Sequence, residues 1–186
     1  MTLLAPVLST GDLPDAELQA ARLDGELYGL ADAFCQIGEL EAPSHRARAV
    51  LAGRSRRLIA ELRTAAWIWL GGPWPERLHF AVTPDARARL SPAQHIAVRE
   101  LVFEPRDLIE LDGAIVTSPL RTIVDLARYD EPFDAGIVTR LAATADLPLD
   151  DCLADLASRA GIPLKKRAQR NLEAARDHAA NPAPTP

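Results

Sequence analysis

The sequence has few cysteines, few aromatic residues and almost no lysine. Its 186 residues include two cysteines, Cys35 and Cys152, which are too few for a disulfide framework and are not spaced as a CxxC motif. We therefore expect a reducing, cytoplasmic setting. The longest apolar run, Thr64 to Gly72, is far shorter than the roughly 20 residues that a membrane span needs, and no basic segment precedes the apolar start of the chain. With 48% apolar residues, the composition predicts a soluble protein with a packed core and no membrane anchor.

Motifs of the common catalytic and cofactor sites are also missing. The four histidines lie in unrelated segments, and the sequence contains no GxSxG, HExxH or CxxC pattern. Gly71-Gly72-Pro73 lacks the Lys-Ser or the further glycine of a phosphate-binding loop, so we interpret it as a helix stop. We predict no catalytic activity, no cofactor and no metal.

One acidic cluster keeps a metal-dependent nuclease as a last-ranked alternative. Its members are Glu104, Asp107, Glu110 and Asp112. Such a site combines carboxylates on a sheet with a nearby lysine, whereas the first lysine of this chain is residue 165. We interpret these carboxylates as the polar rims of strands and a turn.

Charge is spread unevenly along the chain. The net charge is -5, yet the window from His45 to Arg63 sums to +5, so the rest of the chain sums to -10. The candidate phosphate contacts in this window are Arg46, Arg48, Arg54, Arg56, Arg57 and Arg63. A second, smaller basic cluster consists of Lys165, Lys166, Arg167 and Arg170. Each cluster fits either phosphate binding or an ordinary solvated helix face.

Residues 1–43 predict a short helix followed by a hairpin. Apolar residues recur at helical spacing from Leu13 to Leu23, Asp24-Gly25 forms a turn, and two short strands are expected at Glu26–Leu30 and Ala33–Gly38. A helix before a small hairpin is typical of a winged-helix segment, although the residues before Gly25 are too few for three full helices. The hairpin carries no arginine or lysine, which does not favour a basic wing.

Residues 44–130 predict a mixed α/β unit. A helix is expected to open at Pro43 with Ser44 as its N-cap, and a stronger amphipathic helix is expected from Ser55 to Gly71. Alternating apolar residues predict strands at Leu78–Val82 and between Ile96 and Phe103, and a hairpin around Asp112-Gly113. A small antiparallel sheet follows from these strands.

The last third of the chain predicts helices. Ser118 and Pro119 open one helix as N-cap and first residue, and Arg121, Asp125 and Arg128 are spaced to pair along it. Three further helical stretches are expected in residues 131–180, and the proline-rich residues 181–186 predict a disordered tail.

Three tryptophans beside arginines allow either base stacking or core packing. Of these, Trp69 lies on the apolar helix face, whereas Trp74 between two prolines is the one expected to be exposed. Trp67 shares the same helix. Core packing is the interpretation that we favour for the group.

Three stretches of the chain together are similar to one known family. They are Leu23-Asp24-Gly25-Glu26-Leu27, Thr64-Ala65-Ala66-Trp67 and the run VTSPLRTIVDLAR from Val116 to Arg128. They resemble the AbiEi-type antitoxin and transcriptional-regulator family, in the variety common in actinobacteria, over about residues 10–130. The matching signature residues, which we take as structural, are Ser118, Pro119, Arg121, Thr122, Asp125 and Arg128.

The resemblance implies a DNA-binding protein of a type IV toxin-antitoxin system. It implies an N-terminal winged-helix-type domain, an α/β domain, repression of its own operon, and an antitoxin effect that reaches a nucleotidyltransferase-like toxin indirectly. Some relatives also carry a nuclease-like C-terminal domain, from which this helical C-terminus departs.

The sequence as a whole predicts an α+β fold in four parts. These are a degenerate winged-helix-like segment (1–43), an AbiEi-like α/β domain (44–130), C-terminal helices (131–180) and the tail (181–186). The leading hypothesis is a regulator that binds promoter DNA through the arginine window. The alternative is a non-enzymatic protein-interaction module whose DNA-binding segment has degenerated.

Overall fold

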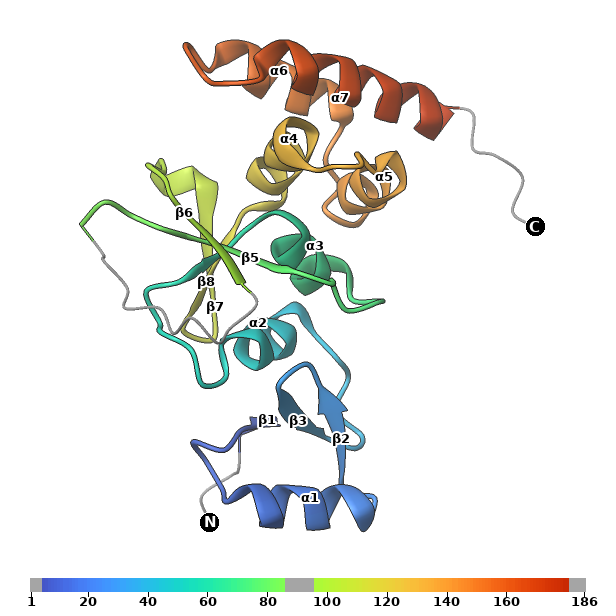
Figure 1. The fold of residues 1–186 in the computed structure, drawn as a ribbon. Helices are drawn as coiled ribbons and strands as arrows, with labels where there is room; N and C mark the ends of the chain where they lie inside the picture. Colours follow the sequence, from blue (N-terminus) through green and yellow to red (C-terminus); the bar gives the residue numbers. More distant parts are fainter. Residues whose placement is uncertain (1–4, 86–95, 181–186) are drawn as a thin grey trace.

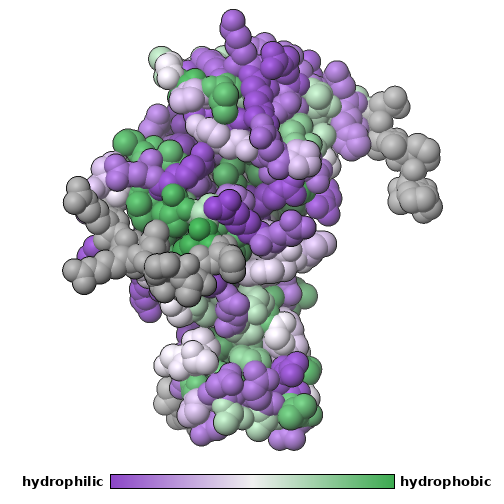
Figure 2. Space-filling model, viewed as in Figure 1, coloured by the Kyte–Doolittle hydropathy of each residue, from purple (hydrophilic) through white to green (hydrophobic). Residues whose placement is uncertain are grey.

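A computed structural model of the chain describes residues 5–85 and 96–180. The fold is α+β, with two sheets and a group of C-terminal helices arranged along an elongated body. Figure 1 shows α1 at one end of the molecule and the helices α4 to α7 gathered at the other end. In the space-filling view, the N-terminal part forms the narrow end of the body (Figure 2).

The N-terminal part has the expected helix and hairpin, with one extra strand in front. The strand β1 (Val7–Leu8) precedes α1 (Asp15–Leu23), and the hairpin strands β2 (Leu27–Leu30) and β3 (Ala33–Gln36) follow. The three strands form an antiparallel sheet in the order β1-β3-β2. Leu8, Leu18 and Leu27 fix α1 against this sheet. A strand, a helix and a hairpin in this order correspond to the second half of a winged helix.

The helix α2 (Pro43–Leu51) joins this part to the rest of the fold. The expected cap by Ser44 is wrong, because Ala42 occupies the N-cap position without a side-chain hydrogen bond, and Ser44 lies inside the first turn. Pro43 begins the helix because its fixed φ suits the first helical position. The start of the helix therefore rests on the proline and not on a hydroxyl cap.

A five-stranded sheet forms the middle of the molecule. Its strands are β4 (Ile59–Ala60), β5 (Leu78–Val82), β6 (Ile96–Glu100), β7 (Leu108–Leu111) and β8 (Ala114–Thr117), in the order β6-β5-β4-β8-β7. Over the two sheets, four of the six described strand pairings are antiparallel, but within the five-stranded sheet two pairings are antiparallel and two are parallel. The parallel pairs are β4 with β8 and β5 with β6. The hairpin of β7 and β8 turns at Asp112-Gly113 as predicted, and φ is positive at both residues.

The central strand β4 replaces the first part of an expected helix. The helix predicted from Ser55 begins only at Leu62, as α3 (Leu62–Leu70), and it ends at Gly71 as expected. Ile59 and Ala60 pair on both sides, with β5 and with β8. A short apolar run suits a buried strand as well as a buried helix, because its periodicity cannot distinguish the two.

Four helices complete the C-terminal part, and their positions confirm the expected helical stretches. They are α4 (Pro119–Tyr129), α5 (Ala135–Thr144), α6 (Leu149–Ser158) and α7 (Lys165–Ala180). Their apolar faces form one core that includes Ile123, Leu141 and Leu172. A single 3₁₀ turn, η1 (Pro105–Asp107), precedes β7. The predicted tail lies outside the described residues.

A second core crosses the expected boundary after residue 43. Val7 and Cys35 of the N-terminal sheet belong to the same cluster as Leu58, Trp67 and Phe80 of the larger unit. The N-terminal part is therefore packed onto the central sheet and its helices. Within the described residues, none of the helices has the length and apolar character needed to span a bilayer.

Candidate functional site

The six arginines of the basic window take very different positions. Arg46 lies on α2 and is only 6% exposed. It donates hydrogen bonds from Nε to the carbonyl of Ile68 (2.7 Å), from Nη2 to that of Trp69 (3.2 Å), and from Nη1 to Glu41 Oε1 (2.8 Å). Because carbonyls in the last turn of a helix lack partners inside it, Arg46 completes the end of α3. The predicted phosphate contact therefore does not fit Arg46.

Arg63 is also committed to the fold. Its Nε and Nη2 donate to the two carboxylate oxygens of Asp130 (2.6 and 2.8 Å), and Nη2 also reaches the carbonyl of Pro132 (3.0 Å). The hydrogen bond to Asp130 raises the pKa of Arg63. This bidentate pair ties α3 to the end of α4. It faces a different hollow of the surface from the other window arginines.

Three arginines of the window line one hollow of about 290 Å³. They are Arg48 at the end of α2 and Arg54 and Arg56 in the loop that follows, and β1 and the β7–β8 turn form the opposite wall. The structure therefore brings together three residues of the predicted set. Arg57, next to Arg56, is exposed as well.

Nearby carboxylates balance two of the three arginines in this hollow. Arg48 reaches Asp112 (3.3 Å) and Asp12 (3.5 Å), whereas Arg54 donates to Asp32 (2.6 Å). Arg54 also donates to the backbone carbonyl of Val50 (2.6 Å). Since the pairs of Arg48 are long and partly exposed, they hold it only weakly.

Arg56 is the best-presented cation of the hollow. It is exposed, and no hydrogen bond or ion pair joins it to another residue in the described ranges. Its guanidinium lies beside Gly113, where a Cβ would stand 4.0 Å from Nη1. The arrangement can receive one anionic oxygen group at Arg56, with Arg48 adjacent.

The N-terminal part itself is strongly acidic. Residues 1–43 contain eight aspartates and glutamates against Arg22 alone. Asp15 and Glu17 occupy the first turn of α1. Their negative charge opposes the binding of phosphate groups at this end of α1.

The signature residues lie inside the molecule around the start of α4. Ser118 caps the helix, since its side chain accepts a hydrogen bond from the backbone N–H of Arg121 (3.3 Å). The hydroxyl of Thr122 donates to the carbonyl of Thr117 (3.0 Å). Pro119 occupies the first helical turn. These contacts place the signature at the junction of β8 and α4.

The charged signature residues form a buried network. Asp125 accepts from Arg121 Nε (2.7 Å) and from Arg128 Nη1 (2.8 Å), so the predicted pairs along the helix are confirmed. Arg121 also reaches Asp107 (2.6 Å), which in turn accepts from Arg159 (2.7 Å). The Arg159 contact joins α6 to η1. Sequence reasoning missed Arg159, although its spacing of four from Asp155 was visible.

The pKa values of two buried carboxyl groups are set by burial and by their arginine partners. Burial raises the pKa of Asp107, but the hydrogen bond from Arg159 and the charge of Arg121 outweigh burial, and the net pKa lies below its usual value. Glu61 is the opposite case, because its burial outweighs the Arg99 hydrogen bonds and raises its pKa. Among residues 5–85 and 96–180, no three metal-ligating side chains are grouped. The candidate nuclease carboxylates are therefore not assembled into a metal site in this part of the chain.

The second basic cluster divides in two. Lys165 donates to the carbonyls of Ala157 and Arg159 (2.7 Å each), and Arg167 pairs with Glu131. Lys166 and Arg170 are exposed one turn apart on α7. Only the second pair is presented to solvent on a common stretch of helix.

The tryptophans follow the expectation of mostly core packing. Trp67 is buried, and Trp69 is partly buried with its Nε1 donating to the carbonyl of Thr117 (3.0 Å). Trp74 is 40% exposed, as predicted from its flanking prolines. Its ring meets that of Trp67 edge to face, with the ring centroids 4.7 Å apart.

The fold and this site define an α+β protein with a winged-helix-like end and an arginine-lined hollow beside it. No protein-family model matches the chain, and a search of curated proteins finds no match. Among solved structures, the chain is similar to the crystal structure of the RV2827C protein from Mycobacterium tuberculosis. The TM-score is 0.47 and the sequence identity 19%, over 96% of this chain and 73% of that one. A similarity at this level says nothing about function, so function is argued from the residues of this chain.

Proposed function

We propose that the chain is a DNA-binding regulator of the AbiEi antitoxin type, which acts in the cytoplasm on the promoter of its own operon. The observation that carries the proposal is the hollow in which Arg48, Arg54 and Arg56 converge beside the hairpin of β2 and β3. The signature run at β8 and α4 supports the family, and the order of β1, α1, β2 and β3 supports a winged-helix origin.

The acidic face of α1 determines how such binding would work. Because eight carboxylates surround the helix and hairpin, the phosphate contacts come from the hollow, and α1 does not lie along a groove as a basic recognition helix would. In this proposal, the protein exerts its antitoxin effect indirectly, by repressing the expression of a nucleotidyltransferase-like toxin encoded nearby.

Salt-dependent binding to the upstream DNA of its own gene tests the proposal. Specific binding should exceed binding to a scrambled duplex, and the affinity should fall steeply as salt rises. Replacing Arg48 and Arg56 together by alanine should reduce the slope of log K against log salt by about 2, because two phosphate contacts are lost. The charge-matched control is Lys166→Ala with Arg170→Ala on α7, which should leave the slope unchanged.

The two outcomes of this comparison are distinct. A slope that falls only in the α7 variant would move the contact surface to the other end of the molecule. A wild-type protein that does not bind either duplex at low salt would refute the proposal.

A protein-interaction module is the second candidate function. Three large apolar side chains of the acidic N-terminal part are exposed: Leu23 (81%), Ile37 (58%) and Leu40 (88%). Exposed apolar residues ringed by charge are typical of protein interfaces. The wild-type chain should capture a partner protein in a pull-down, and replacing all three by serine should abolish that capture. A wild-type chain that recovers no partner above background, or a variant that captures the partner as well as the wild type does, would count against this second function.

A further inference from the structure

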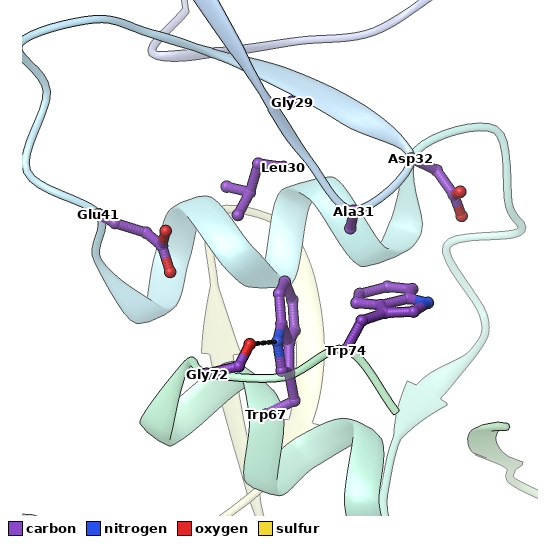
Figure 3. Close-up of a pocket in the computed structure, with 8 residues that line it drawn as sticks. All are labelled: Gly29, Leu30, Ala31, Asp32, Glu41, Trp67, Gly72 and Trp74. Carbon is purple, nitrogen blue, oxygen red and sulfur yellow. Dashed lines mark hydrogen bonds between the residues drawn. The ribbon is translucent and has the colours of Figure 1, made fainter. Parts of the chain in front are cut away.

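A pocket of about 370 Å³ lies between the β2–β3 hairpin and the segment that follows α3. Figure 3 shows the indoles of Trp67 and Trp74 beneath Leu30 and Ala31 of the hairpin. Asp32 and Glu41 stand on opposite sides of the same pocket (Figure 3). It is separate from the hollow that holds Arg48 and Arg56.

Two aromatic walls meet at nearly a right angle in this pocket. The planes of Trp67 and Trp74 are inclined by 87°. Trp67 is fixed in place, since it is buried and its Nε1 donates to the carbonyl of Gly72 (3.0 Å). Trp74 is the more exposed of the two, and its ring packs edge to face with that of Trp67. Tryptophan faces carry negative electrostatic potential and attract cations more strongly than other aromatic side chains.

Two carboxylates stand at the rim, and each is paired with an arginine through one of its oxygens. Asp32 Oδ2 accepts a hydrogen bond from Arg54 (2.6 Å), and Glu41 Oε1 accepts one from Arg46 (2.8 Å). No hydrogen bond reaches the other two carboxylate oxygens from the described part of the chain. Both side chains remain partly exposed, at 53% and 36%. The surrounding residues 1–43 are strongly acidic, and this adds a field of the same sign.

We propose that this pocket binds an alkylammonium cation, with Trp67 and Trp74 as its walls and Asp32 and Glu41 as its counter-charges. The rounded shape of a trimethylammonium group can touch two perpendicular walls at once, whereas a planar guanidinium stacks on only one of them. Its charge is spread over methyl groups, so it enters an aromatic pocket at a lower desolvation cost than a primary ammonium.

Choline and its neutral isostere test the proposal directly. Choline and 3,3-dimethylbutan-1-ol have the same shape, and only choline is charged. Titration of the full chain by calorimetry, with the indole N–H signals followed by NMR, should show choline binding about tenfold tighter than the isostere. The signal of Trp74 should shift upon binding. Equal binding of the two compounds, or no binding of choline, would overturn the proposal.

Variants locate the site. Trp74→Leu removes an exposed wall without opening the core, so the protein should fold and lose choline binding at least fivefold, whereas Trp74→Phe should retain part of it. Asp32→Asn should weaken choline and leave the isostere unaffected. Asp150→Asn, an exposed carboxylate on α6 outside the pocket, is the matched control. Unchanged choline binding in Trp74→Leu would place the cation elsewhere and refute the assignment.

A further binding experiment distinguishes two sources of such a cation, a free small molecule and a modified protein side chain. A short peptide that contains trimethyllysine presents the same headgroup on a protein side chain. Tighter binding of this peptide than of choline would indicate a modified side chain as the natural ligand, and tighter binding of choline would indicate a free small molecule.

Discussion

The buried carboxylate of Asp125 offers the most direct test of how the C-terminal part is held together. Asp125 is 0% exposed and neutralises Arg121 and Arg128, which lie 2.7 and 2.8 Å away. Asp125→Asn preserves the volume of the side chain but removes its charge, and it turns an amide N–H₂ or a neutral oxygen toward the two guanidinium groups. Removing one partner of a buried ion pair costs about 3–5 kcal/mol. Because Arg121 keeps Asp107 at 2.6 Å, we expect a loss near the lower end, about 3 kcal/mol.

Urea unfolding measures this loss, provided that the slope m is unchanged between the variants. Asp150→Asn is again the matched control, because this carboxylate is 73% exposed and pairs with Arg176 on the surface. The control should unfold at nearly the same urea concentration as the wild type, since exposed pairs contribute little. If the two variants had the same midpoint, the buried network would not stabilise the fold as we argue.

Three further predictions concern single groups of the same region. Burial raises the pKa of Asp107, but the hydrogen bond from Arg159 holds it below its usual 3.8. The stability that Asp107 contributes is therefore present above that pH and is lost as the pH falls through the folded-state pKa. Asp107→Asn should flatten the acid limb of a plot of melting temperature against pH. Ser118→Ala removes the N-cap of α4 and should cost about 1 kcal/mol in urea unfolding. Burial raises the pKa of the Cys152 thiol to about 12, so a disulfide exchange reagent at pH 8 should leave it unmodified in the folded protein and react with it in urea.

Local signals were sufficient for most of the elements. The hydroxyl and proline before α4, the Asp-Gly turn between β7 and β8, and the alternation in β5 each specify an element through neighbouring residues alone. The strand β4 is different. Its two residues are a strand because β5 lies on one side and β8 on the other, and β8 starts more than fifty residues later in the sequence. Pairing with distant residues overrides local periodicity here.

The predicted site residues also differ in whether their partners are near or distant in the sequence. An arginine-rich window was visible in the sequence, but the partner of Arg63 lies 67 residues away and the Asp112 partner of Arg48 lies 64 residues away. Arg46 is directed to carbonyls of a different helix. Sequence spacing reveals ion pairs within a helix, as for Asp125, because both partners share one face. Sequence spacing does not show which arginines form ion pairs or hydrogen bonds with distant residues in the folded chain. Arg56 could therefore not be distinguished from the other arginines of the window before the structure was known.

Packing between the two parts constrains how the N-terminal end can act. Cys35 of the hairpin sheet shares a core with Trp67, and Arg54 ties the loop after α2 to Asp32 at the hairpin turn. The hairpin, the hollow and the tryptophan pocket are therefore parts of one packed body, since each contains residues that the others contact. A ligand at Trp74 that moved the hairpin would also have to break or re-aim the Arg54–Asp32 pair, whose arginine lines the hollow. If both proposed sites bind their ligands and the pocket ligand moves the hairpin, this one ion pair couples the two binding events, and linkage requires the coupling free energy to be the same in both directions.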